Sequence, residues 1–491
     1  MPPLAKRRTI VIHPPRRAPW LARLGNAMAR HRRLILGVQW AIVLLYAVLV
    51  VLPAFLPHPN AEARLFSGDW GSAHSLAADG AALTDKAAYV AHWHERLVLL
   101  AQYLFWGVWW PFVVLSIMLM GRVWCGVLCP EGALSEWASR HGRGGAIPRW
   151  LRWGGWPVLA FILTTVYGQL ISVYEYPQAA LLILGGSTVA AMVVGGMYGR
   201  GKRVWCRYLC PVSGVFALLA RVAPVHFRVD RAAWLAHSER SPAVDCAPLL
   251  QVGQLNSMAQ CHACGRCSGH KDAVALQARS PAAEILSARA ASWPETLLLL
   301  FGLLGVAIGA FQWTVSPWFV RGKQWAAEWL VNHDLFWPLE ANAPWWLLTN
   351  HPESGDAFSW LDGAAVLAYM LATALLLGGA VALGSWLAAR LARQQPRALV
   401  LALVPLAGLG LFLGLSMMSV THLRAEGVPL AWLPWARGAL LLLGATWSWW
   451  LGLRLLARPA PGALRWLAAS AVWTLPVALV SGAWVLVFYV W

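Results

Sequence analysis

Long apolar runs constrain this sequence more than any other feature. A segment needs about 20 mainly apolar residues to cross the roughly 30 Å hydrocarbon core of a bilayer. Only 12% of the residues are charged, which is about half the share found in soluble domains. We therefore expect an all-α polytopic membrane protein with about nine transmembrane helices rather than a soluble enzyme. The nine runs cover residues 34–55, 97–120, 153–174, 178–197, 296–319, 364–389, 398–419, 436–456 and 466–490.

The excess of positive charge predicts how the chain is oriented. The sequence has 39 Lys and Arg against 21 Asp and Glu, a formal net charge of +18. In a soluble protein this excess would suggest nucleic-acid binding, but Lys and Arg also accumulate in the cytoplasmic loops of membrane proteins. When the N-terminus is placed inside, most of the basic residues fall in the inner segments. We therefore expect a multi-pass protein of the bacterial inner membrane, with a cytoplasmic N-terminus, a periplasmic C-terminus and no nucleic-acid partner.

The spans divide the chain into four expected parts. A basic cytoplasmic N-terminus (1–33) precedes a four-helix membrane unit (34–222), and a cytoplasmic segment (223–294) separates that unit from a C-terminal five-helix membrane domain (295–491). The C-terminal domain carries an outer loop, residues 320–362, that is dense in Trp. Tryptophan prefers the level of the lipid headgroups, so this loop predicts an interfacial belt.

A duplicated motif places four cysteines at the predicted inner surface. The pattern R-V-W-C-x-x-L-C-P occurs at residues 122–130 and again at 203–211, each time after a span that has returned to the cytoplasm. Two hairpins with the same topology are related by a pseudo-twofold axis along the membrane normal, so their cysteine pairs can converge on one site. Palmitoylated or simply packed cysteines are the alternative. The four residues are Cys125, Cys129, Cys206 and Cys210.

A ferredoxin-like run supplies three more cysteines. Residues 261–267 read C-x2-C-x2-C, the beginning of the bacterial ferredoxin pattern C-x2-C-x2-C-x3-C-P. Lys271 stands where the fourth cysteine would be, so Cys246 is the best remaining fourth ligand and His270 is a weaker candidate. We therefore expect residues 223–294 to form a small cytoplasmic ferredoxin-like iron-sulfur segment. The cysteines of the run are Cys261, Cys264 and Cys267.

The eight cysteines match the ligand count of two 4Fe-4S clusters. Four thiolates hold one cubane, so the twin motif would bind one cluster and the ferredoxin-like segment the other. An equally economical scheme exchanges ligands between the two sites. Zinc is the competing metal, because four thiolates, or three with a histidine, also satisfy its tetrahedral site. Structural zinc usually uses two separated C-x2-C pairs, and the triple run therefore favours iron and sulfide.

Histidines at the predicted outer surface are a candidate end point for an electron path. Clusters at the cytoplasmic face cannot by themselves carry electrons across about 30 Å of hydrocarbon, so an outer haem or copper site, or a quinone, would have to contribute. More often such residues are solvated loop histidines. The candidates are His92, His94, His333, His351 and His422, the last close to Met417 and Met418.

Together, the motifs resemble those of the membrane polyferredoxins of the NosR, NapH and CcoG type, over about residues 97–289. The resemblance implies 4Fe-4S clusters, and electron transfer between the quinone pool or the cytoplasm and a periplasmic enzyme or metal centre. It also implies that the cysteines of the twin motif and of the ferredoxin-like run are cluster ligands.

We therefore predict an inner-membrane iron-sulfur protein that passes electrons through 4Fe-4S clusters at the cytoplasmic face, between quinone or a cytoplasmic donor and a periplasmic redox partner. Such a chain is an electron-transfer component rather than a stand-alone enzyme. A cluster-containing redox sensor or a metalloenzyme assembly factor is one alternative, and a transporter with a structural zinc domain is another. The transporter is disfavoured because the spans contain few of the ionisable residues that mark a substrate path.

Overall fold

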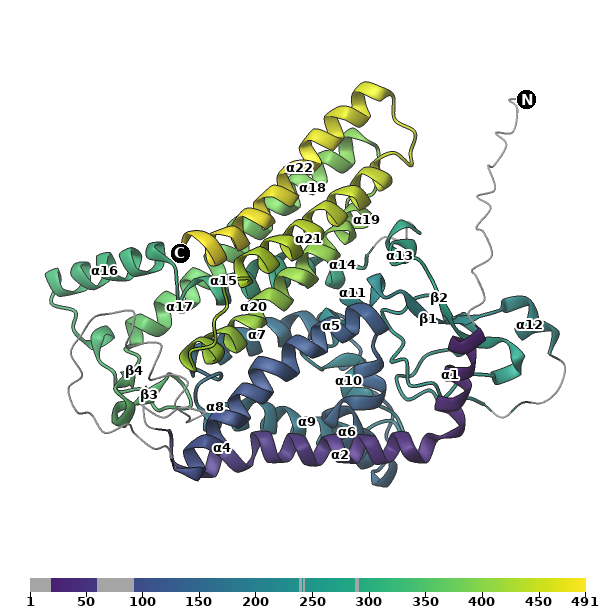
Figure 1. The fold of residues 1–491 in the computed structure, drawn as a ribbon, viewed down its shortest axis with the longest axis horizontal. Coiled ribbons are helices and arrows are strands. Elements are labelled where there is room, and N and C mark those ends of the chain that lie inside the picture. Colours follow the sequence, from purple (N-terminus) through teal and green to yellow (C-terminus); the bar gives the residue numbers. More distant parts are fainter. Residues whose placement is uncertain (1–18, 60–91, 238–240, 242, 288–290) are drawn as a thin grey trace.

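Eight apolar helices form the body of the protein (Figure 1). The computed structural model describes residues 19–59, 92–237, 241, 243–287 and 291–491. Within these residues, each of the eight helices is long and apolar enough to cross a membrane, which confirms the predicted polytopic helical fold. The spans are Arg32–Phe55, Trp93–Met120, Pro177–Met197, Trp293–Gln312, Trp360–Leu391, Pro396–Ala425, Leu433–Leu456 and Ala463–Val490.

Several spans are composite, because π-helical or 3-10 turns interrupt the α-helix without breaking it. Such turns re-aim the helix at the cost of poorer hydrogen-bond geometry. Proline occupies the first turn of many of these helices, where its missing N–H costs nothing. The α-helical segments are α2 (Arg32–Val50), α4 (Trp93–Gln102), α5 (Trp110–Met120), α8 (Pro177–Ala180), α9 (Gly186–Met197), α14 (Trp293–Leu297), α15 (Ala307–Gln312), α17 (Trp360–Thr373), α18 (Gly379–Leu391), α19 (Pro396–Val400), α20 (Val404–Ala425), α21 (Leu433–Leu456) and α22 (Ala463–Val485).

The ninth predicted run, residues 153–174, forms a shorter helix than the sequence suggests. Helix α7 (Trp156–Leu170) has 15 residues and therefore rises about 22 Å, less than the roughly 30 Å hydrocarbon core. It ends early because Ser172 adopts a left-handed backbone conformation, with φ of 49°. The chain then turns, and α8 begins at Pro177.

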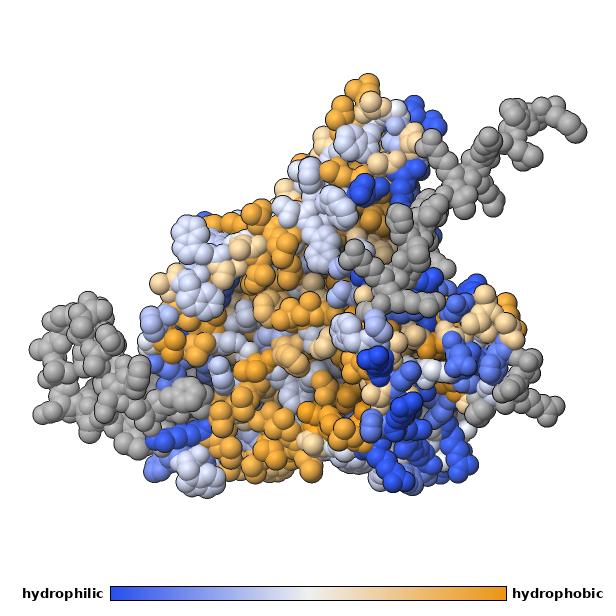
Figure 2. All heavy atoms as spheres, turned by 45° about the vertical axis from the view of Figure 1, so that its right-hand side comes forward, coloured by the Kyte–Doolittle hydropathy of each residue, from blue (hydrophilic) through white to orange (hydrophobic). Residues whose placement is uncertain are grey.

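The hydrophilic segments gather at two opposite ends of the bundle (Figure 1). One end carries the cysteine-bearing segment, and the other carries most of the Trp-rich loop. Between them, Figure 2 shows apolar side chains over the middle of the molecule and hydrophilic ones concentrated near the cysteine-bearing end. The first end includes α1 (Pro19–Arg30), β1 (Val225–Val229), α12 (Arg231–Ala236), β2 (Val274–Ala278) and α13 (Ala283–Leu286), and the second α16 (Pro317–Asn332), β3 (Asn350–His351) and β4 (Asp356–Ala357).

A two-stranded antiparallel sheet closes the cysteine-bearing segment. Strands β1 and β2 pair in register, with Phe227 opposite Leu276. Helix α1 packs on β2, and its Leu21 is buried in the same apolar core as these two residues. The loop between the strands contains the last four cysteines of the chain. The N-terminal helix therefore covers the hairpin that frames them.

Candidate metal centres

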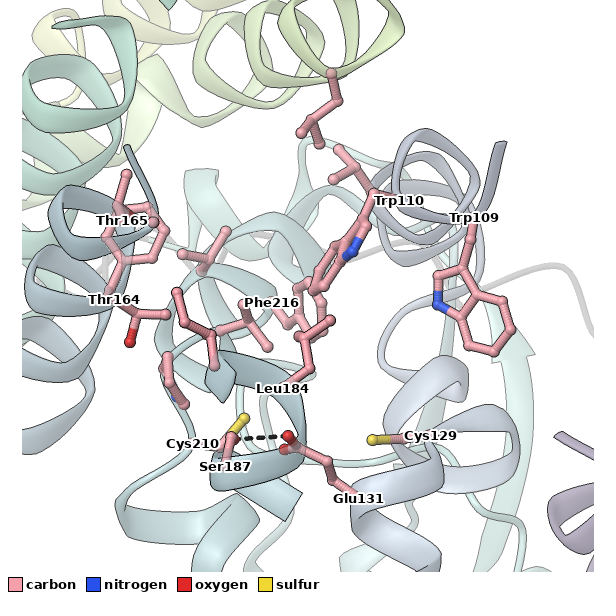
Figure 3. A pocket seen from close by; sticks show the side chains of 18 of the residues that line it. Trp109, Trp110, Cys129, Glu131, Thr164, Thr165, Leu184, Ser187, Cys210 and Phe216 are labelled. Atoms are coloured by element: carbon pink, nitrogen blue, oxygen red, sulfur yellow. Dashed lines mark hydrogen bonds between the residues drawn. The ribbon is translucent and has the colours of Figure 1, made fainter. Parts of the chain in front are cut away.

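The four cysteines of the twin motif line one cavity of about 270 Å³ (Figure 3). Cys125 lies in a π-helical turn, and Cys129 caps α6 (Pro130–His141). Cys206 lies in α10 (Val204–Tyr208), and Cys210 precedes α11 (Ser213–Leu219). The structure thus brings the two C-x3-C-P pairs together.

Burial raises the pKa of Cys206 to about 12 and also raises the pKa of Cys129 and Cys210. For Cys129 and Cys210 the other cysteines of the cavity raise the pKa further. A buried thiol cluster of this kind stays protonated unless a cation compensates the thiolate charge. The donor set therefore fits a site that holds a metal centre.

The other four cysteines line a second, separate pocket together with His262 and Arg266. Burial raises the pKa of Cys261 to about 12, and also that of Cys267. His270 does not line this pocket but lies against the ring of Trp234, with 5.3 Å between ring centroids. The four cysteines are Cys246, Cys261, Cys264 and Cys267.

The two cysteine sets touch through the backbone at Gly126. A Cβ atom there would lie 2.0 Å from the carbonyl oxygen of His262 and 2.9 Å from the amide nitrogen of Cys264. Gln39 of α2 donates its side-chain amide to the carbonyl oxygen of Gly126, at 2.9 Å. Only glycine permits this approach, and the buried Gln39 holds the peptide in place.

The arginine of each motif copy reaches across to the other copy. Arg122 donates to the hydroxyl of Ser213 at 2.8 Å, and that hydroxyl donates to the carbonyl oxygen of Cys206 at 2.8 Å. Arg203 donates to the carbonyl oxygen of Cys125. The two motif copies therefore make reciprocal hydrogen bonds, as expected for a pair related by a pseudo-twofold axis.

A buried carboxylate, Glu136 of α6, connects both cysteine sets. Arg203 donates to Glu136 at 2.9 Å, and Arg266, which lies between Cys264 and Cys267, donates to both of its oxygens at 2.6 and 2.7 Å. The side chains of Arg203 and Glu136 are 1% and 5% exposed. Burial acts to raise the pKa of Glu136, but the two arginines outweigh it and hold the pKa at about 2.

The cavity at the twin motif extends beyond the thiols into the bundle. In Figure 3, Cys129 and Cys210 lie on either side of Glu131, whose carboxylate accepts a hydrogen bond from Ser187 at 2.6 Å. The indole of Trp205 donates to the same carboxylate at 3.3 Å. Most of the remaining wall is apolar and aromatic, and it includes Trp106, Trp109, Trp110, Tyr174 and Phe216.

The candidate outer histidines have separate ring neighbours. His351 stacks on Tyr176 with 3.7 Å between centroids, His333 stacks on Trp329, and His92 stacks on His94. His422 packs against Tyr103. In the part of the chain that the structure describes, no three His, Cys, Asp or Glu side chains are close enough to share one metal ion.

Comparisons with known proteins agree with the cysteine pattern. The sequence matches the family model described as a 4Fe-4S binding domain over residues 103–153 and 179–230, and each stretch contains one copy of the twin motif. The cysteine run at residues 261–267 lies outside both stretches. No solved structure gives a significant match.

Three bacterial relatives align with parts of the chain. YccM of Escherichia coli, whose name describes an electron transport protein, is 25% identical over 235 residues, which are 41% of this chain and 64% of YccM. The regulatory protein NosR of Pseudomonas aeruginosa is 29% identical, over 37% of this chain and 29% of NosR. Protein NirI of Paracoccus denitrificans is 31% identical, over 23% of this chain and 19% of NirI.

The alignments cover less than two thirds of the length of each of these relatives. They confirm the predicted resemblance to membrane polyferredoxins, and the family match supports a 4Fe-4S binding domain in this chain.

Three residues of the site were not singled out by sequence reasoning. Gln39 is the one amide in the apolar run 34–55, and that isolation is a signal for a specific hydrogen bond. Glu136 and Gly126 carry no comparable signal, because their roles depend on segments far away in the sequence.

We predict that Glu136→Gln destabilises the protein by about 3–5 kcal/mol, because it leaves Arg203 and Arg266 without a buried counter-charge. Thermal unfolding in detergent measures the effect. Arg140→Ala is the matched control, since it removes the more exposed partner of the same carboxylate and should cost at most about 1 kcal/mol.

The difference between Glu136→Gln and the wild type should depend on pH. The folded-state pKa of Glu136, about 2, lies below its ordinary value of 4.5, so its contribution is complete above pH 4.5 and is lost as the pH falls toward 2. Equal stability of both proteins at neutral pH would contradict a central role for Glu136.

Proposed function

We propose that this chain is an inner-membrane electron-transfer protein with two 4Fe-4S clusters at its cytoplasmic end. The observation that carries the proposal is that the eight cysteines form two sets of four, which meet at Gly126. The first set, from the twin motif, would hold one cluster, and Cys246 with the ferredoxin-like run would hold the other. Each cluster would supply reversible one-electron chemistry.

The order of the cysteines in the sequence supports iron and sulfide over zinc. Residues 261–267 form a triple C-x2-C-x2-C run, which is typical of ferredoxins, whereas structural zinc sites commonly use separated C-x2-C pairs. The match of both copies of the twin motif to a 4Fe-4S binding domain supports the same choice for the first cysteine set.

We predict about eight iron and eight acid-labile sulfide per chain in anaerobically purified protein. Cys210→Ser and Cys246→Ser should each remove about half of both, and the matched variant His270→Ala should remove neither. Iron and sulfide analysis and low-temperature EPR of the reduced protein measure the outcome. Zinc without sulfide would refute the clusters. Loss of iron in His270→Ala but not in Cys246→Ser would show that His270, and not Cys246, is the fourth ligand of the second cluster.

Electrons would pass between the two clusters across the contact at Gly126. This contact joins the loop between Cys125 and Cys129 directly to the backbone of residues 262–264. Arg203 contacts the first set and, through Glu136, also Arg266 of the second. Rigid backbone and paired charges on both sides favour a fixed separation of the clusters.

We predict that Gly126→Ala weakens the magnetic interaction between the two reduced clusters, because the added Cβ clashes with the carbonyl oxygen of His262. The EPR spectrum should lose its spin–spin broadening while the iron content stays unchanged. Gly37→Ala in α2 is the control, because a Cβ there meets no atom within 4 Å. Unchanged broadening in Gly126→Ala would place the electron path elsewhere.

The apolar end of the cavity, away from the four thiols, supports a quinone as the electron-exchange partner. Trp106 stacks on Trp110 and meets Tyr174 edge-on, and such aromatic walls suit a planar ring. A quinol releases two electrons and two protons, and two clusters that each take one electron match that stoichiometry.

We predict that Thr164→Trp, which fills the cavity wall, slows reoxidation of the reduced clusters by a short-chain ubiquinone about tenfold, equivalent to about 1.4 kcal/mol. Leu163→Trp, on the exposed side of the same helix, is the control. Ferricyanide should oxidise both variants at the wild-type rate. A quinone site in this cavity would be refuted if the rate at which quinone reoxidises the clusters is equal in both variants and does not saturate with quinone concentration.

A periplasmic redox partner would exchange electrons at the end that carries α16 and β3 (Figure 1). The excess of basic residues supports a cytoplasmic cysteine-bearing end, and hence a cytoplasmic N-terminus and a periplasmic C-terminus. Redox sensing is the second candidate function, which the similarity to the regulatory protein NosR favours. Clusters that quinone does not reoxidise would favour sensing over relay.

A further inference from the structure

A second large cavity opens near the first cysteine set; it shares Arg122 with the wall of that set but contains none of the cysteines. Its volume is about 340 Å³, and it lies between the N-terminal ends of α7 and α14 and the start of α11. Its wall combines three arginines with aromatic and apolar side chains. These are Arg122, Arg152 and Arg207 together with Trp153, Val158 and Leu298.

The cavity carries an excess of positive charge. Its one carboxylate, Glu295, already pairs with Arg221 and accepts a hydrogen bond from the backbone of Ser292. Arg122 contributes charge rather than free donors, because its two Nη atoms bond Ala259 and Ser213 and its Nε is buried. Arg152 is exposed at the rim. The wall therefore presents positive charge, and the N–H donors of Arg152, to an anion.

The position of the cavity matches the level of lipid headgroups. Pro157 and Pro294, in the first turns of α7 and of the span that begins with α14, both line it. The N-terminal ends of helices add positive potential there. Trp153 and Trp293 are 55% and 64% exposed nearby, and exposed tryptophans mark the membrane interface.

We propose that this cavity binds the phosphate headgroup of an anionic phospholipid. Basic pockets between membrane helices on the cytoplasmic side are suited to such headgroups. Arg152 and Arg207 would hold the phosphate, while Val158 and Leu298 would contact the glycerol and the upper acyl chain. Free phosphate is also an anion, but it has no apolar part that could contact these two side chains. This site does not depend on the electron-transfer proposal.

A lipid bound here would also contact the framework of the first cysteine set. Arg207 lies between Cys206 and Cys210 in the sequence, and Arg122 bonds the carbonyl oxygen of Ala259 and the hydroxyl of Ser213. Arg122 therefore also braces the loops around the thiols, and Arg207 belongs to the motif itself. Arg152 touches neither loop in the hydrogen bonds of the described residues, which makes it the position to test.

Native mass spectrometry of the full chain in detergent, titrated with phosphatidylglycerol or with phosphatidylcholine, tests the proposal. The wild type should bind one phosphatidylglycerol more tightly than any phosphatidylcholine. Arg152→Ala should weaken that affinity about tenfold, as expected for the loss of about 1.4 kcal/mol. Arg152→Lys should retain most of it. Arg149→Ala, which removes an exposed arginine that does not line the cavity, is the matched control.

Equal phosphatidylglycerol affinity in the wild type, Arg152→Ala and Arg149→Ala would overturn the proposal. If an excess of inorganic phosphate displaces the lipid, the cavity is a site for free phosphate, and the proposal of a lipid headgroup is wrong. Thermal unfolding checks that each variant is folded. If Arg152→Ala is unstable, Trp153→Ala on the same wall replaces it, and the same loss of affinity is expected.

Discussion

The ion pairs of Glu136 are the interaction on which the cysteine-bearing end depends. A buried charge is costly unless it is paired and hydrogen-bonded, and Glu136 joins an arginine of the twin motif to one of the ferredoxin-like run. Three segments that are far apart in the sequence must therefore be present before the carboxylate is satisfied. This makes the two cysteine sets one cooperative unit rather than two independent sites.

The two copies of the duplicated motif differ at one position that matters for the contacts between them. Gly132 and Ser213 occupy equivalent positions, each three residues after the second cysteine of its copy. A Cβ at Gly132 would lie 3.1 Å from the Nη1 of Arg203, so glycine there leaves room for that arginine to reach Cys125. In the other copy, the hydroxyl of Ser213 relays the contact of Arg122 to Cys206. The two copies therefore reach the same cross-contact by different means.

Sequence patterns predicted the membrane helices well because hydrophobic length is a local property. They overestimated α7, because the end of a helix depends on single residues such as Ser172 as much as on hydropathy. The two sets of cysteines were predicted from the spacing of the motifs and, for Cys246, by elimination, and their assignment as cluster ligands stays a prediction. The contact at Gly126 was out of reach, because it depends on how two loops separated by more than a hundred residues approach each other.

The packing of α1 on β2 sets an order for biosynthesis. Helix α1 ends at Arg30, but its partner strand is complete only at Ala278. The hairpin that frames the last four cysteines therefore cannot close until the ribosome has passed residue 278, by which time the spans up to Met197 have been made. All eight cysteines precede residue 278. Closing of α1 over the hairpin is therefore a step that follows the synthesis of every cysteine of the chain.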